Sequence, residues 1–242
     1  MAEIRESVLD VFNEIKKELN DYYIFKEKVK VKDYLLRKFY EILGRHIKSS
    51  NFDYNSVALT FNKVYFWKNL LKNLIFFDEF YDLIGDSILD VGCGAAPVSI
   101  AIAELMKHKE EKKNSFTLMD KSRNQLSVAK DITQLIDMKV ESYIEGFFEI
   151  TFEKHSELVV FSYFFCEQER DFLKRLFNNR ENFSGGFVVI DYKDNVMKIE
   201  KYFRENGDNR IKAVSLNYSV PFTLSKLIYD TEVNVHACIY RP

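Results

Sequence analysis

The chain has 242 residues, a formal net charge of −2, 47% hydrophobic residues and 15% aromatic residues. This composition excludes a disordered or fibrous protein, and the charge of the whole molecule gives no reason to expect a polyanionic partner. The three cysteines lie far apart and no pair has metal-ligand spacing, so we expect neither a disulfide framework nor a metal site.

The first third of the chain has a helical pattern. Apolar residues recur at helical spacing in residues 6–19, 31–43 and 55–85, and no strand pattern interrupts them. We therefore expect an all-helical N-terminal module over residues 1–84, which would cap the substrate side of the domain that follows. Residues 26–48 of this module carry eight basic and three acidic side chains. That run is either a solvated helix face or a phosphate-binding patch for RNA.

From residue 85 onward, short apolar runs alternate with helical stretches. This alternation predicts an α/β domain over residues 85–242 with a doubly wound parallel sheet. The expected strands are 87–91, 115–120, 139–144, 157–164 and 185–192, and the expected helices between them are 97–108, 124–137 and 167–179. Two further strands, 211–220 and 232–241, follow each other closely, which indicates an antiparallel hairpin at the C-terminal end.

The motif "SILDVGCGAAP" places an acid and two glycines where the first of these strands turns into a helix. The carboxyl ends of parallel strands are where an open sheet binds ligands, and glycines there let a ligand approach the backbone. Pro97 stands where a dinucleotide motif has its third glycine, and Asp90 would repel a pyrophosphate but suit an ammonium group. Asp120 ends the next strand 26 positions after Gly94, close to the spacing at which an acid binds ribose hydroxyls.

The run "ILDVGCGAAP", with Asp120 ending the next strand, resembles the class I S-adenosylmethionine-dependent methyltransferases over about residues 86–241. The resemblance implies a Rossmann-like seven-stranded sheet that closes with an antiparallel hairpin, and S-adenosylmethionine as the cofactor. It places Asp90 near the methionine amino group of the cofactor. It also assigns Gly92, Cys93 and Gly94 to the methionine and ribose, and Asp120 to the ribose hydroxyls, with the adjacent Lys121 as a further cofactor-binding residue.

Positions further along the chain extend the resemblance. It implies that Glu145, Gly146 and Phe147 lie beside the adenine, and that Ser162 and Tyr163 face cofactor and substrate. The segment after residue 160 lacks the N/D-P-P-Y/F signature of amino-directed nucleic-acid methyltransferases, which argues against base N-methylation. "SYFFCE", together with "ALTFNKVYFWKNLL", is distantly similar to the mitochondrial small-ribosomal-subunit-associated methyltransferase-like family, whose cysteine cluster this chain lacks.

Methyl transfer from S-adenosylmethionine requires few catalytic groups from the protein. A sulfonium methyl group is already electrophilic, so the protein mainly has to align the nucleophile and exclude water. Tyr163 and Glu167 are the catalytic candidates, and Asp191 is a second acid at a strand end that could serve as a general base. Cys166 is either a nucleophile or, more in keeping with a lone thiol, a buried small residue.

The function that the sequence favours is transfer of a methyl group from S-adenosylmethionine to a small-molecule acceptor. The alternatives are an rRNA or tRNA methyltransferase, transfer of the aminobutyrate group of S-adenosylmethionine, and a non-catalytic binding module. No signal-peptide pattern and no membrane-spanning run is found, so we expect a cytoplasmic protein without a membrane partner. The aromatic-rich helices are compatible with a homodimer.

Overall fold

The computed structural model describes residues 2–22, 24–25, 54–111, 114–146, 155, 157–163 and 171–242. Several sequence predictions fall outside these residues: the helix at 31–43, the basic run at 26–48, and the roles of Phe147, Cys166 and Glu167.

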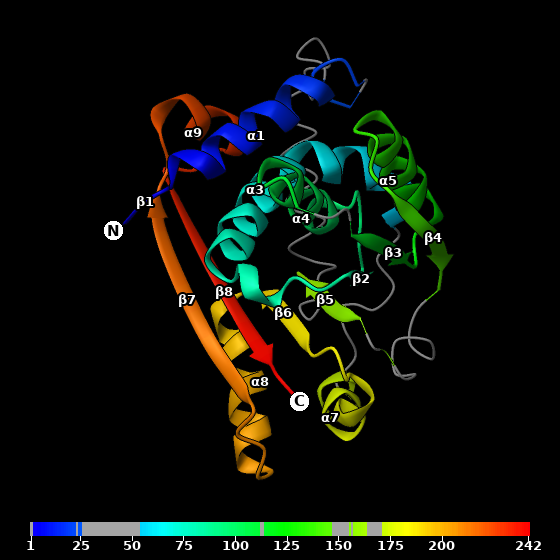
Figure 1. Cartoon of the computed structure of the whole chain (residues 1–242), viewed down its shortest axis with the longest axis vertical. Coiled ribbons are helices and arrows are strands. Elements are labelled where there is room, and N and C mark those ends of the chain that lie inside the picture. Colours follow the sequence, from blue (N-terminus) through cyan, green and yellow to red (C-terminus); the bar gives the residue numbers. More distant parts are fainter. Residues whose placement is uncertain are drawn as a thin grey trace.

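The described residues form one eight-stranded sheet in the order β1-β7-β8-β6-β5-β2-β3-β4 (Figure 1). The strands are β1 (Ala2–Glu3), β2 (Ser87–Val91), β3 (Ser115–Asp120), β4 (Val140–Glu145), β5 (Leu158–Ser162), β6 (Phe187–Asp191), β7 (Ile211–Ser219) and β8 (Glu232–Tyr240). Strands β2 to β6 run parallel, while β8 is antiparallel to both β6 and β7. The predicted doubly wound sheet with a C-terminal antiparallel pair is therefore confirmed.

The strand order reverses beside β2, which pairs with β3 on one side and with β5 on the other. Connections leaving the sheet in opposite directions from this point open a crevice at the carboxyl ends of β2 and β5. The "GCG" motif directly follows β2, so the fold brings the motif to the position where an open α/β sheet binds its ligand.

Helices cover both faces of the sheet (Figure 1). They are α1 (Glu6–Leu19), α3 (Tyr54–Glu79), α4 (Pro97–His108), α5 (Arg123–Leu135), α7 (Phe172–Asn178), α8 (Lys193–Glu205) and α9 (Phe222–Ile228), with short 3₁₀ turns at Tyr81–Leu83 and Arg180–Asn182. The buried side chains of α1, α3, α4, α5 and α9 form one apolar cluster with the sheet, and those of α7 and α8 form a second. The short segment that connects β7 to β8 in the chain contains helix α9, and the two strands pair antiparallel as the sequence predicted.

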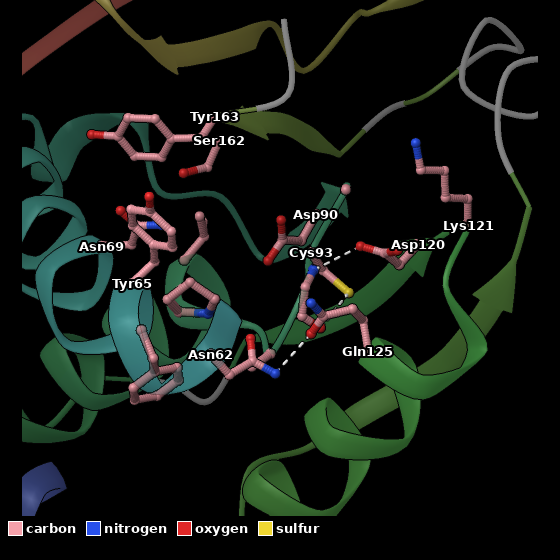
Figure 2. A pocket seen from close by; sticks show the side chains of 16 residues that line it. Asn62, Tyr65, Asn69, Asp90, Cys93, Asp120, Lys121, Gln125, Ser162 and Tyr163 are labelled. Carbon is pink, nitrogen blue, oxygen red and sulfur yellow. Dashed lines mark hydrogen bonds between the residues drawn. The ribbon is translucent and has the colours of Figure 1, made fainter. Parts of the chain in front are cut away.

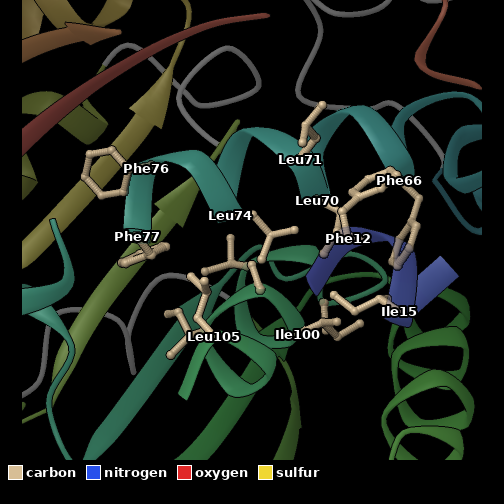
Figure 3. Packing of buried hydrophobic residues seen from close by; sticks show 14 of the residues in the cluster. Phe12, Ile15, Phe66, Leu70, Leu71, Leu74, Phe76, Phe77, Ile100 and Leu105 are labelled. Carbon is tan, nitrogen blue, oxygen red and sulfur yellow. The ribbon is translucent and has the colours of Figure 1, made fainter. Parts of the chain in front are cut away.

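Helix α3 is the centre of the larger cluster (Figure 3). Its residues Leu70 and Leu74 are fully buried and face Ile100 and Leu105 of α4, while Phe12 of α1 packs beside them. A helix with apolar side chains on most sides must be covered on most sides. This burial fixes α3 against α4 and α5 and so fixes its position over the sheet.

The N-terminal residues join the sheet directly, which the sequence did not indicate. Strand β1 runs parallel to β7, with Ala2 opposite Tyr218 and Glu3 opposite Ser219, because the edge of β7 offers unpaired backbone groups there. Two residues are too few to show an alternating pattern.

The division of the chain between residues 84 and 85, which falls just before β2, stays a prediction. None of the described helices is both long enough and apolar enough to cross a membrane.

Candidate cofactor and acceptor site

The loop after β2 is shaped by two glycines in the left-handed region, Gly92 (φ +71°) and Gly94 (φ +55°). The backbone N–H groups of Gly92 and Cys93 donate to the carbonyl oxygen of Met119 on β3 (2.8 and 2.9 Å), which ties the loop to the neighbouring strand. A Cβ atom at Gly94 would meet no protein atom within 4 Å. The loop therefore leaves one face of its backbone open to a ligand.

Asp90, the fourth residue of β2, is fully buried at the base of this loop. Its Oδ2 accepts a hydrogen bond from Ser99 Oγ of α4 (2.8 Å), whereas its Oδ1 has no hydrogen-bond partner in the described part of the chain. The pKa of this carboxyl group is raised from 3.8 to about 7, mainly by burial and to a smaller extent by the nearby Asp120, while the hydrogen bonds from Ser99 oppose the shift. A half-paired, desolvated carboxylate of this kind is suited to a cationic ligand group.

Asp120 ends β3 on the other side of the loop. Its Oδ2 accepts from the Gly94 N–H and its Oδ1 from the Ser122 N–H, both at 2.8 Å. Burial raises the pKa of Asp120, although these two hydrogen bonds oppose the shift. The carboxylate thus holds the glycine loop in place and borders the space above it.

These groups surround a pocket of about 710 Å³, a volume that includes its open mouth (Figure 2). Its lining residues come from α3, the β2–α4 loop, the ends of β3 and β5, and α5: Asn62, Tyr65, Phe66, Asn69, Asp90, Gly92, Cys93, Gly94, Ala95, Pro97, Val98, Asp120, Lys121, Gln125, Ser162 and Tyr163. Asn62 Nδ2 donates to Gln125 Oε1 (2.8 Å), which links α3 to α5 across one end. The buried Nε2 of Gln125 has no partner among the described residues, so it is a second polar atom available to a ligand.

The end of β5 supplies the opposite side of the pocket. Tyr163 follows the strand with φ +55°, a left-handed conformation that is rare for a bulky residue. Its N–H donates to the carbonyl oxygen of Ile190 (2.7 Å), and its ring packs edge-on against Tyr192 with centroids 5.8 Å apart. In Figure 2, Tyr163, Tyr65 and Asn69 lie on one side of Asp90, and Asp120 and Lys121 lie on the other.

Most of the residues that the sequence singled out meet in this pocket. Those that line it are Asp90, Gly92, Cys93, Gly94, Asp120, Lys121, Ser162 and Tyr163. Glu145 is opposite Asp120 in the sheet register, and the Gly146 N–H donates to the carbonyl oxygen of Asp120 (3.1 Å), but neither residue lines the pocket as described. Phe147 and Glu167 are outside the described residues.

Asp191, the second acid considered as a general base, is not among the residues that line the pocket, whereas Cys93 is. Asp191 is buried, and its Oδ1 accepts from the Tyr192 N–H (2.7 Å) and from Asn195 Nδ2 (2.8 Å) at the start of α8. Burial raises the pKa of the Cys93 thiol well above its usual value, so this side chain is an inert part of the wall.

The α3 wall is the part of the site that the sequence analysis did not find. Asn62, Tyr65 and Asn69 are spaced three and four residues apart, so they share one face of the helix. The signal that could have revealed them is a run of polar side chains at helical spacing within a largely apolar helix. Ser99 and Gln125 gave no such signal, because nothing in the sequence distinguishes them from the other polar residues of α4 and α5.

Comparison with known proteins agrees with the fold. No family model and no curated protein sequence matches the chain. Among solved structures, magnesium protoporphyrin IX methyltransferase from Synechocystis PCC 6803, with bound S-adenosylmethionine, superposes with a TM-score of 0.50 over 78% of this chain and 93% of that one, at 13% identity.

Two other similar structures have lower scores. The plantazolicin methyltransferase BpumL, in complex with S-adenosylhomocysteine, has a TM-score of 0.48 at 13% identity and covers 99% of both chains. The tRNA (uracil-54, C5)-methyltransferase of Pyrococcus abyssi has a TM-score of 0.43 at 14% identity and covers 70% of this chain and 38% of that chain. The strand order and the superposition on magnesium protoporphyrin IX methyltransferase show that the chain has the fold of the class I S-adenosylmethionine-dependent methyltransferases.

Proposed function

We propose that this protein binds S-adenosylmethionine in the pocket beside β2 and transfers its methyl group to a small-molecule acceptor by in-line displacement. The observation that carries the proposal is Asp90, a fully buried carboxylate with one unpartnered oxygen at the edge of that pocket. A dinucleotide would bring a pyrophosphate to this acid, whereas S-adenosylmethionine brings an ammonium group. When bound, the cofactor supplies an activated methyl group on a sulfonium centre.

The residues of the pocket divide between binding and alignment. Asp90 is suited to the amino group and Asp120 to the ribose hydroxyls, while the open backbone at Gly94 lets the cofactor lie against the loop. Tyr163 and Tyr65 border the opposite side, where their aromatic faces would stabilise a sulfonium cation and exclude water from the acceptor. Tyr163, together with Glu167 from the following segment, stays our candidate for contact with the acceptor.

Calorimetric titration tests the cofactor assignment. We expect wild-type protein to bind S-adenosylmethionine and S-adenosylhomocysteine but not NAD, and Asp120→Ala to bind both at least about tenfold more weakly, because a hydrogen bond to a charged group is lost. Glu205→Ala, an exposed change on α8, is the matched control and should bind like wild type. Binding of NAD, or no binding of either sulfur compound, would remove the proposal.

The product separates the remaining alternatives. Incubation with S-adenosylmethionine and a panel of acceptors, followed by mass spectrometry, should yield S-adenosylhomocysteine; methylthioadenosine would instead indicate aminobutyrate transfer. Steeply salt-dependent affinity for RNA would favour the RNA alternative, since phosphate contacts release counterions.

A further inference from the structure

Lys72 on α3 is a partly buried ammonium group without a carboxylate partner in the described part of the chain. Its Nζ lies 4.8 Å from the centroid of the Tyr163 ring. The preceding lysine on the same helix is different, because Lys68 forms an ion pair with Asp230 at 2.7 Å. Lys72 thus has an aromatic face as its neighbour where Lys68 has an acid.

Charges from several elements surround this group. The pKa of Lys72 is lowered to about 8, mainly by burial and to a smaller extent by Lys68 on α3, whereas Asp230 after α9 and Asp191 at the end of β6 oppose the shift. On β8, burial lowers the pKa of His236, and the charges of Lys72 and Lys193 lower it as well, so the pKa shift of His236 favours the uncharged ring beside Lys72. A buried ammonium group that has no ion-pair partner is stabilised when an anion binds beside it.

The position of Lys72 connects it to the proposed cofactor pocket. Tyr163, whose ring faces Lys72, lines that pocket next to Ser162, and Asn69, one helical turn before Lys72, lines it as well. Tyr192, which is 54% exposed, packs against the edge of Tyr163. Figure 2 shows Tyr163 and Asn69 at the end of the pocket away from Asp120, which is the side left for an acceptor. Lys72 and Tyr192 do not line the pocket themselves, but each contacts the Tyr163 ring.

We propose that Lys72 binds an anionic group, a carboxylate or a phosphate, on a small-molecule methyl acceptor that lies against Tyr163 and Tyr192. The inference rests on the proposed function and names the class of acceptor. A small molecule fits better than RNA, because one ammonium group can neutralise only one of the many phosphates that an RNA backbone carries. The single charge of Lys72 can pair with one anionic group of a compact ligand.

The test follows the ammonium group itself. Lysines are tagged by reductive ¹³C-methylation, the Lys72 signal is assigned with Lys72→Arg, and its titration is recorded by NMR with S-adenosylhomocysteine bound. Benzoate and inorganic phosphate are the probes for the two anion types, and benzamide is the neutral counterpart of benzoate. We expect benzoate or phosphate to raise the pKa of Lys72 by about half a unit or more, and benzamide to leave it unchanged.

Calorimetry on the untagged protein gives the second measurement. The anion that shifts the Lys72 signal should bind about tenfold more weakly to Lys72→Met and nearly normally to Lys72→Arg and to Lys201→Met, an exposed change on α8. The inference is overturned if neither anion shifts the signal, if benzamide acts like benzoate, or if an RNA oligonucleotide binds at Lys72 in preference to both. If wild-type protein does not bind S-adenosylhomocysteine at all, the proposed function fails. That outcome is distinguishable from a failure of the Lys72 inference alone, in which S-adenosylhomocysteine still binds.

Discussion

The backbone N–H of Gly94 donates to the carboxylate of Asp120 across 2.8 Å, so the loop that follows β2 is held by the last residue of β3. The two residues are 26 positions apart in the chain, and parallel pairing of the strands brings them together. The acid assigned to ribose recognition therefore also sets the shape of the glycine loop. Binding of a ligand and order in the loop should depend on the same carboxylate.

Gly94→Ala should damage binding more than folding. The left-handed φ of +55° costs an alanine about 1 kcal/mol, and its Cβ would enter the space left open above the loop. We expect a drop in melting temperature of a few degrees and a loss of S-adenosylhomocysteine affinity of about tenfold or more. Gly207→Ala is the matched control, because Gly207 has φ +84° and equally open surroundings but lies after α8. Equal affinity in the two variants would contradict the placement of the cofactor.

Affinity for the cofactor should increase with pH through neutrality. Asp90 has a pKa raised to about 7, so below that pH most of it is protonated and cannot pair with an ammonium group. Calorimetry of S-adenosylhomocysteine binding should show affinity rising by up to about tenfold per pH unit below pH 7 and levelling off above it. Asp120, whose pKa is also raised, acts in the same direction, so Asp90→Asn serves to isolate the effect. If wild type shows no steeper pH dependence than this variant, Asp90 does not bind the amino group.

The same carboxyl group should weaken the ligand-free fold at high pH. Its pKa is higher in the folded state than the ordinary 3.8, so the folded state binds the proton more tightly and loses stability as pH rises from about 4 to 7. Asp90→Asn should therefore be more stable than wild type at pH 8, by at most about 4 kcal/mol, with a smaller gain at pH 5. Urea unfolding of ligand-free protein at both pH values measures the difference. If the variant is less stable than wild type at pH 8, interactions within the folded protein must compensate for the burial of the ionised Asp90 carboxylate.

Two adjacent buried residues of α3 should respond differently to truncation. Asn73 and Leu74 are both fully buried, but neither side-chain polar atom of Asn73 has a hydrogen-bond partner in the described part of the chain. Leu74→Ala should cost about 3 kcal/mol through lost burial and a cavity. Asn73→Ala should cost clearly less, because it also removes two desolvated polar groups. Chemical denaturation of both variants makes the comparison, and an equal loss would mean that Asn73 is hydrogen-bonded in solution.

The sequence was informative where one segment determines its own structure. Ile88, Leu89 and Val91 form most of the short run at residues 87–91, as expected for a buried strand, and the acid Asp90 with the two glycines that follow marks its carboxyl end. The acid at Asp120 could be placed because the βα unit has a regular length. Helix α8 was missed, since its apolar residues Val196, Ile199 and Phe203 are few among charged neighbours.

The α3 wall of the pocket depends on tertiary structure. Asn62 and Gln125 lie 63 residues apart and meet only because α3 and α5 pack on the same face of the sheet. The same holds for Lys72 and Tyr163, which no local pattern connects. Periodicity identifies a helix, but it does not say which of its faces the rest of the chain will cover.

Helix α3 carries the pocket residues Asn62, Tyr65 and Asn69 and, within the same turns, the core residues Leu70 and Leu74. Both sets are fixed to one rigid rod, so the orientation of either set determines that of the other. Inserting a single residue between Asn69 and Leu70 would rotate the two sets by about 100° relative to each other. Related proteins with other acceptors should therefore differ at Asn62, Tyr65 and Asn69 by substitution only. An insertion or deletion in α3 would either rotate these side chains out of the pocket or disrupt the packing of the core.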